Sequence, residues 1–482
     1  MSSKKKIKDH DCTTFKTVKL KNYQLLPAKF IVNPLNRGLL LLFDVGHGKT
    51  LSSIAMIRCL LAKYPQKHVI VLTPASLITN YQNELKKVSG DLGDPILDRI
   101  RVESYGKYIN YIKNHHLKAN NNTILVCDEA QYLIGAGSSR FKNIFDFSVD
   151  AYKVILLSAT PVRNGPEEIS NLMSLLNGAK FSRSLIEKVF QMVDPKDRTA
   201  GFKKLLNCKI AYHRPSANSR NPDGTTASHN KDFPQRIDHR VPLVMSKDYY
   251  QNYLRIQENV QKDLPDAFQN TTNLTTFLNG IRRAVNVSSI TLISPKIDWT
   301  INKIKKDLGM IPGFKGNKKV LVYSNWLDAG VNLLKAELTI LGIPFSEVTG
   351  QLSRAQKDIE IKNYNSGKNK VILISASGAE GLNLKNTRSV ILLEQAWNNS
   401  RLEQAIGRAI RLHSHRTLPE AQRKVDVYSL ILEKPKSVKA NGDIVPSGDQ
   451  ILELLSRNKD YSINKFYEIL SSVSIEKNKS CF

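Results

Sequence analysis

Five consecutive residues have the types and spacing needed to bind phosphate, and they read Gly46-His47-Gly48-Lys49-Thr50. Glycines in such a loop let backbone N–H groups approach phosphate oxygens, and a following helix N-terminus adds partial positive charge. Lys49 is expected to neutralise the β- and γ-phosphates of a nucleotide, and the Thr50 hydroxyl to hold Mg²⁺. The usual pattern has a further glycine where this chain has Phe43. The competing interpretation is a glycine turn that binds nothing, and Gly-Lys-Thr argues against it.

An acidic pair, Asp128-Glu129, supplies the second part of this chemistry. Asp128 is expected to hold Mg²⁺ opposite Thr50, and Glu129 to orient and deprotonate the water that attacks the γ-phosphate. By itself the pair would be interpreted as a solvated helix cap. Its position directly after the apolar run Thr123–Cys127, in the same half of the chain as the phosphate loop, favours the catalytic role.

Two arginines late in the chain could supply further positive charge. On a continuous helix, Gln404, Arg408 and Arg411 lie at i, i+4 and i+7, which is one face. Two guanidinium groups beside Gln404 would clamp phosphate charge. The second half of the chain contains no phosphate loop, so these arginines are expected to act as fingers on the nucleotide bound by the first half.

Short apolar runs predict the strands that position these residues. Each run is followed by a polar cluster, which is the arrangement at the carboxyl edge of an open parallel sheet. The runs are 39–43, 68–74, 123–127 and 154–157, then 319–323, 371–375 and 390–393. Stretches with helical spacing lie between them. The chain is therefore expected to form two α/β units, with Tyr23-Gln24 available to stack on and hydrogen-bond to an adenine.

Composition narrows the class of partner. The chain has 482 residues, with 71 Lys+Arg against 43 Asp+Glu, giving a net charge of +28. That excess favours a polyanion, nucleic acid first, although solubility or a biased genome would also explain it. The five cysteines are odd in number and form no Cys-x-x-Cys, so we expect a reducing compartment with neither disulfides nor zinc. We find no signal peptide and no apolar run long enough to span a membrane.

The ordered set of motifs resembles superfamily 2 helicases and translocases, nearest to the branch of the SWI/SNF-like chromatin-remodelling ATPases. The motifs are Gln24, Gly46–Thr50, Asp128-Glu129-Ala130-Gln131, Ser158-Ala159-Thr160-Pro161, Gly381–Leu384 and Gln404–Arg411. The continuation Arg411–Pro419 is similar to a viral group that contains the poxvirus nucleoside triphosphate phosphohydrolase I and the small subunit of the early transcription factor. Gln131 departs from the pattern, which usually has His or Asp there.

The resemblance implies an α/β fold with two RecA-like domains, a helical insert and a short C-terminal extension. The expected boundaries are 1–14 for a basic disordered tail, 15–235 for the ATP-binding domain, 236–298 for a helical insert or linker, 299–435 for the second domain and 436–482 for the extension. Near the end of the ATP-binding domain, 216–231 is expected to be an exposed loop because it is rich in Asn, Ser, Thr, Gly and Pro.

The resemblance also implies residue roles. Gln24 reads adenine, the loop Gly46–Thr50 binds ATP, Thr50 and Asp128 bind Mg²⁺, and Glu129, Arg408 and Arg411 serve hydrolysis with Gln404 beside them. Ser158 and Thr160 would couple hydrolysis to domain movement. The residues expected to face a nucleic-acid backbone are Thr73, Ser324, Thr349, Gly350, Ser375, Gly378 and Gly381.

The function expected from this set is an ATP-dependent motor on nucleic acid, DNA being favoured over RNA, that serves viral-type transcription in the host cytoplasm or the virion. An RNA polymerase or a transcription factor subunit is the expected protein partner. One alternative is a strand-separating helicase of replication or transcript release. Another is a non-catalytic promoter-binding or scaffold subunit with a vestigial nucleotide site.

Overall fold

The computed structural model describes residues 12–88, 90, 94–135, 137–214, 233–262, 280–288, 294–376, 378, 382–397, 399–435, 439–440, 443–444 and 446–482. The chain divides into two compact units, the first made of Met1–Asn218 with Tyr461–Phe482 and the second of Ser219–Asp460. The basic tail at 2–8 and the loop at 216–231 lie outside the described residues. The expected domain boundaries stay predictions.

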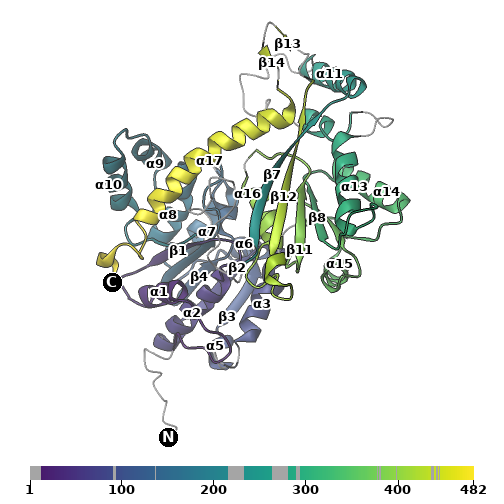
Figure 1. Cartoon of the computed structure of the whole chain (residues 1–482). Helices are drawn as coiled ribbons and strands as arrows, with labels where there is room; N and C mark the ends of the chain where they lie inside the picture. Colours follow the sequence, from purple (N-terminus) through teal and green to yellow (C-terminus); the bar gives the residue numbers. More distant parts are fainter. Residues whose placement is uncertain are drawn as a thin grey trace. The chain divides into compact units, whose positions relative to one another are not determined.

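The first unit is built on a six-stranded, entirely parallel sheet (Figure 1). Its strand order is β3-β2-β4-β5-β1-β6. The strands are β1 (Gly38–Phe43), β2 (His68–Thr73), β3 (Ile100–Ser104), β4 (Thr123–Cys127), β5 (Lys153–Ser158) and β6 (Ile210–His213). Four of them are the predicted apolar runs, and they occupy the central positions because both of their faces are buried.

Helices cover both faces of this sheet. Side chains alternate along β1, so Leu40 and Leu42 join one core while Leu39, Leu41 and Phe43 join the other. The first core is closed by α6 (Tyr105–His115), α7 (Ser139–Ser148), α8 (Ile169–Asn177), α9 (Arg183–Phe190) and α10 (Pro195–Leu206). The second is closed by α1 (Asn22–Ile31), α2 (Lys49–Lys63), α3 (Ile78–Lys87) and α5 (Asp94–Leu97). The result is a doubly wound α/β sandwich.

The second unit repeats this plan with another six-stranded parallel sheet, in the order β7-β12-β11-β8-β10-β9. Its strands are β7 (Gln235–Val244), β8 (Lys319–Ser324), β9 (Phe345–Val348), β10 (Val371–Ser375), β11 (Thr387–Leu392) and β12 (Lys424–Glu433). A separate two-stranded ribbon pairs β13 (Lys439–Ala440) with β14 (Asp443–Ile444). The fold class expected from the sequence, two parallel sheets flanked by helices, is confirmed.

Apolar residues of α13 (Pro295–Leu308) and α14 (Asn332–Ile340) pack on one face of the second sheet, and those of α15 (Arg354–Ser366) and α16 (Ser400–Ala409) on the other. Helix α11 (Lys247–Lys262) belongs to a smaller cluster of its own. The last helix, α17 (Gly448–Ser472), starts in the second unit, and its last twelve residues belong to the first, where Phe466 and Leu470 are fully buried. No helix among the described residues is both long and apolar enough to cross a membrane.

The expectation that the cysteines are unpaired was wrong for four of the five. Cys12 is disulfide-bonded to Cys59 in α2, and Cys208 to Cys481, while Cys127 is buried and reduced. The paired residues are 47 and 273 positions apart in the sequence, so only the fold brings them together. Both bonds lie within the first unit and tie the two ends of the chain to it.

Candidate nucleotide site and motor elements

The phosphate loop lies at the carboxyl end of β1 and leads directly into α2. Gly46 and Gly48 have φ values of 82° and 75°, in the left-handed region that glycine adopts without strain. A Cβ on Gly48 would also lie 2.4 Å from Nε2 of Gln24, so a side chain there would displace the Gln24 amide. These constraints explain why both glycines are needed for the turn that the sequence predicted.

Lys49 and Thr50 form the first turn of α2, where the free N–H groups of the helix attract anions. The Lys49 ammonium donates to the carbonyls of Phe43 (2.9 Å) and Asp44 (3.2 Å), which holds it beside the loop. A cation and a helix N-terminus at the same turn give this part of the molecule the chemistry that binds a nucleotide's phosphates.

An ion pair that the sequence did not reveal fixes the start of the loop. Arg214 Nε lies 2.9 Å from Oδ1 of Asp44, and both side chains are largely buried. The Arg214 guanidinium also packs on the ring of Tyr467 in α17, 3.8 Å from its centroid. The C-terminal helix therefore supports the phosphate loop through Arg214. The sequence carries no local signal for this ion pair, because Asp44 and Arg214 are 170 positions apart.

Aromatic and amide side chains line the other side of the loop. The side-chain oxygen of Gln24 accepts a hydrogen bond from the backbone N–H of Lys21, the N-cap residue of α1 (2.9 Å). Its side-chain nitrogen donates a weak hydrogen bond to His47 O (3.4 Å). Tyr23 donates to the same carbonyl (3.2 Å) and stacks on His213 with ring centroids 3.5 Å apart. Burial lowers the pKa of His213 to about 4, so it is neutral near pH 7. The structure thus places Gln24 against the phosphate loop, while its part in adenine recognition stays a prediction.

Asp128 and Glu129 follow β4 at the same edge of the sheet. The Asp128 carboxylate accepts from the Thr73 hydroxyl and from Glu129 N, both at 3.1 Å, and the Tyr105 hydroxyl donates to Asp128 O (2.8 Å). Burial and the charge of Glu129 raise the pKa of Asp128. Glu129 has a left-handed backbone with φ 52°, a conformation that costs free energy in a non-glycine residue and often occurs at functional sites.

Gln131 connects this acidic pair to the next motif. Its amide nitrogen donates to Glu129 Oε2, and its amide oxygen accepts from Ser158 Oγ at 2.7 Å. Ser158 Oγ in turn accepts from Thr160 N at 3.0 Å. A continuous chain of hydrogen bonds therefore runs from Glu129 to the Ser158–Thr160 turn. An amide suits this position because it offers a donor and an acceptor at once.

The prediction that Gln404, Arg408 and Arg411 share a helical face was wrong for Arg411. Helix α16 ends at Ala409, and Ile410 has the extended angles φ −101° and ψ 92°. Arg411 lies in the following turn, where its Nε donates to Gly407 O (3.0 Å) and its N–H to Ser414 Oγ (3.2 Å). Gln404 and Arg408 remain on the helix. What Arg408 and Arg411 contribute to hydrolysis stays a prediction.

Most residues expected to face nucleic acid are buried. Thr73 donates to Asp128, Ser324 to Glu394, and Thr349 to Glu347, which accounts for each hydroxyl. The exposed fractions are 0% for Thr73, 1% for Ser324, 0% for Thr349 and 5% for Ser375. Gly350 is exposed, Gly378 is buried, and Gly381 lies outside the described residues. A Cβ on Gly378 would lie 1.8 Å from Val348 O, so this glycine is needed for close backbone packing.

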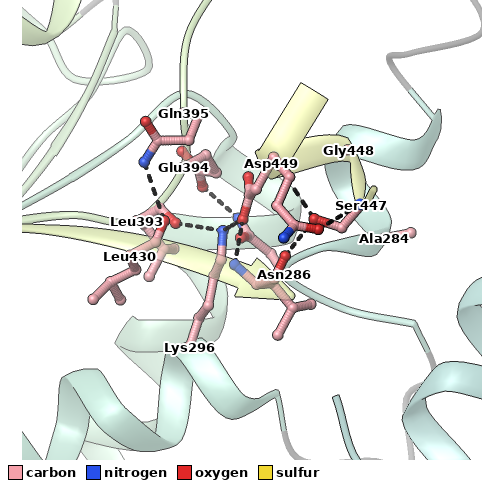
Figure 2. Close-up of polar contacts among 12 residues, drawn as sticks. Ala284, Asn286, Lys296, Leu393, Glu394, Gln395, Leu430, Ser447, Gly448 and Asp449 are labelled. Carbon is pink, nitrogen blue, oxygen red and sulfur yellow. Dashed lines mark hydrogen bonds and ion pairs between the residues drawn. The ribbon is translucent and has the colours of Figure 1, made fainter. Parts of the chain in front are cut away.

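A buried network of charged and polar residues lies at the carboxyl edge of the second sheet (Figure 2). Glu394, just past β11, accepts from Asn286, from Ser324 Oγ (2.6 Å) and from Asn325 N (2.9 Å). Lys296 is fully buried, pairs with Asp449 at the start of α17 and donates to Leu393 O (2.7 Å). Buried charges persist only when they are paired and hydrogen-bonded, so the network holds the 324–326 segment in one conformation.

The fold and the site define a phosphate-loop nucleoside triphosphatase with two RecA-like domains. Residues 23–100 and 98–288 match the SNF2-related domain, and residues 301–413 match the helicase conserved C-terminal domain. A protein of Acanthamoeba polyphaga mimivirus described as an ATP-dependent RNA helicase is 31% identical, covering 95% of this chain and 98% of its own. The chain therefore belongs to the SNF2-related family of helicase-type ATP hydrolases.

Two further similarities are more distant. Nucleoside triphosphatase I of Heliothis armigera entomopoxvirus is 24% identical, covering 95% of this chain and 79% of its own. The solved SWI2/SNF2 ATPase core of Sulfolobus solfataricus with dsDNA is 20% identical, covers 86% of this chain and 88% of its own, and has a TM-score of 0.39.

Proposed function

We propose that this protein is an ATP-driven motor that translocates on DNA and serves transcription in a large cytoplasmic DNA virus. The observation that carries the proposal is the hydrogen-bonded chain from Glu129 through Gln131 to Ser158 and Thr160. Such a chain links the group expected to activate water to the motif expected to couple hydrolysis to domain movement, which is the connection that a motor requires.

The chemistry would proceed at the carboxyl edge of the first sheet. Lys49 and the N–H groups of α2 bind the phosphates, Glu129 orients and deprotonates the attacking water, and Arg408 and Arg411 stabilise charge on the γ-phosphate. The Thr50 hydroxyl and the Asp128 carboxylate supply the hard oxygen ligands that Mg²⁺ prefers, and the ion would screen the phosphate charge. Mg²⁺ usually keeps several waters and is held by one or two carboxylates together with substrate phosphates, and this donor set fits that pattern.

Nucleic acid is the proposed track. The net charge of +28 supports phosphate contacts that ignore base sequence. Relatives of this chain include a poxviral nucleoside triphosphatase and a protein described as an RNA helicase, both from large DNA viruses. On this basis we propose the host cytoplasm or the virion as its location and an RNA polymerase or a transcription factor subunit as its partner.

The test is steady-state ATP turnover with double-stranded DNA, single-stranded DNA and RNA of equal length. We expect stimulation by DNA, with a DNA affinity that falls by orders of magnitude between about 50 and 200 mM salt if roughly six or more phosphates are contacted. Displacement of a triplex-forming strand without separation of the duplex would identify translocation. Turnover that ignores every nucleic acid would contradict the proposal.

The relative described as an RNA helicase favours a second candidate, a strand-separating helicase of replication or transcript release. ATP-dependent separation of a partial duplex would select it. A third candidate, a promoter-binding or scaffold subunit with a vestigial nucleotide site, requires that Lys49, Asp128 and Glu129 be kept without use. Absence of turnover together with tight DNA binding would select that one.

A further inference from the structure

A cavity of about 350 Å³ opens on the second unit. It is lined by the end of α13, the loop 314–318 that follows, Arg388 near the start of β11, and Tyr428 of β12. Lys318 and Arg388 lie at the amino ends of their strands, whereas Ser324, Ser375 and Glu394 mark the carboxyl ends. Ligands of open parallel sheets bind at the carboxyl ends of the strands. Because this cavity lies at amino ends, it is separate from the proposed nucleotide site.

The cavity has a large positive charge. Five of its lining side chains are cationic (Lys303, Lys306, Lys315, Lys318 and Arg388), and one is acidic, Asp307. Lys303 pairs with Asp307, and Lys318 with Asp426. Lys306, Lys315 and Arg388 form no ion pair with any residue that the structure describes. Three uncompensated cations around one concavity predict an anionic ligand.

Flat aromatic surface adjoins these cations. The Phe314 ring is 46% exposed, and the Lys306 ammonium lies 4.2 Å from its centroid. Tyr428, which also lines the cavity, contacts His239 with ring centroids 4.6 Å apart and Trp299 at 5.5 Å. An exposed ring beside lysines is the combination that stacks a base while neutralising a phosphate.

The loop that builds the cavity is closely packed against the helix before it. A Cβ on Gly316 would lie 2.4 Å from Lys306 O and 2.5 Å from Gly309 N, so only glycine fits. Lys318 N donates to Asp307 O at 2.9 Å, which closes the loop onto the end of α13. Phe314 and Lys315 are thus presented by a fixed turn, and little ordering free energy would be lost when a ligand binds.

We propose that this cavity, the α13 pocket, binds a nucleoside phosphate. Its volume lies within the range of about 300–1,000 Å³ that is typical of small-ligand sites. The phosphate would contact Lys306, Lys315 and Arg388, and the base would stack on Phe314. The same chemistry is available from a free nucleotide or from a nucleotide within a strand.

The test uses the full chain and AMP, measured by equilibrium binding, with azido-AMP crosslinking to locate the site. We expect crosslinks on the peptide that contains Phe314, and a loss of AMP affinity of about tenfold or more in Lys306→Ala/Lys315→Ala. The matched control, Lys203→Ala/Lys204→Ala, removes two exposed lysines of α10 and should bind AMP like the parent. Both double variants should keep the parental ATP turnover.

Further ligands separate the alternatives. Phe314→Ala should weaken AMP and leave the weak binding of pyrophosphate unchanged, because only the nucleoside stacks. Displacement of AMP by a 5′-phosphorylated single strand would assign the pocket to a strand, and displacement by mononucleotides alone would assign it to free nucleotide. The proposal is overturned if crosslinks fall only between Gln24 and Thr50, or if pyrophosphate competes as well as AMP.

Discussion

Gln131 donates its side-chain amide to the carboxylate of Glu129, so the group expected to activate water is held by a residue two positions along the chain. The same amide accepts from Ser158 at 2.7 Å. Gln131 is 3% exposed, which leaves its amide few alternative partners. The Gln131 side chain therefore both positions Glu129, the expected general base, and connects it to Ser158 of the next motif.

The first prediction separates these two duties. Glu129→Gln should keep ATP binding and lose turnover by roughly 10²–10⁴-fold, the usual cost of removing a general base. Gln131→Leu should lose turnover while Glu129 remains, because the carboxylate is no longer oriented and Ser158 loses its acceptor. Nucleotide binding and single-turnover hydrolysis would be measured on both, with Lys49→Ala as the variant that does not bind ATP. Parental turnover in Glu129→Gln would show that another group activates the water.

The second prediction concerns the buried pair in Figure 2. Lys296→Met leaves Asp449 charged and unpaired, and should cost about 3–5 kcal/mol of unfolding free energy. Lys296→Met/Asp449→Asn removes the stranded charge and keeps an acceptor for Leu432 N, so its loss should be smaller.

Urea unfolding followed by tryptophan fluorescence measures this effect directly. All three tryptophans, Trp299, Trp326 and Trp397, belong to the second unit, so the signal reports that unit. The control is Arg457→Met, which breaks an exposed pair with Glu453 and should cost at most about 1 kcal/mol. A double variant less stable than Lys296→Met would contradict the buried-charge explanation.

The third prediction concerns His213. Burial lowers the pKa of this histidine to about 4. The unfolded chain, with an ordinary pKa near 6.5, binds more protons between these values, so stability rises with pH there and is lost as pH falls. After allowance for solvent screening the loss at pH 5 should be on the order of 1 kcal/mol. His213→Phe keeps the stack on Tyr23 and should flatten the dependence of melting temperature on pH, whereas His115→Phe, at an exposed position, should not.

The fourth prediction concerns the disulfides. They close sequence separations of 47 and 273 residues, and each should stabilise the first unit by about 2–4 kcal/mol. Dithiothreitol should therefore lower the melting temperature of the parent. Cys12→Ser/Cys481→Ser should start lower and show no response to the reductant. Free-thiol titration provides the check, and five reactive thiols in the unfolded, unreduced protein would exclude both bonds.

The sequence was most informative where both faces of a strand are buried. Continuous apolar runs identified β1, β2, β4 and β5, together with the glycine turn that follows β1. The missed strands of the two six-stranded sheets, β3, β6, β7, β9 and β12, are short or carry polar residues on a partly exposed face, as in Ile100–Ser104 at the sheet edge. Their pairing comes from the neighbouring strand, and no local pattern encodes it.

The candidate site shows the same division. Glycines and charged residues next to a strand were predicted because their local spacing determines the turn. The Asp44–Arg214 pair joins residues 170 positions apart, and the Lys296–Asp449 pair depends on where α17 begins. Arg411 was placed on a helix because the spacing continued, but the chain leaves the helix at Ile410.

The last prediction concerns Arg411, proposed to stabilise the γ-phosphate during hydrolysis. Its Nε donates to Gly407 O, so the end of α16 helps to orient the side chain. Arg411→Ala should leave ATP affinity within a few-fold and remove most DNA-stimulated turnover, since arginine fingers contribute about 10³–10⁵ in rate. Arg416→Ala, an exposed arginine beyond the same turn, is the matched control and should keep the parental rate. Melting curves of both variants would show that the fold is retained. DNA-stimulated turnover at the parental level in Arg411→Ala would mean that this arginine serves only the turn in which it lies, and the proposed part of the second unit in hydrolysis would then rest on Arg408 alone.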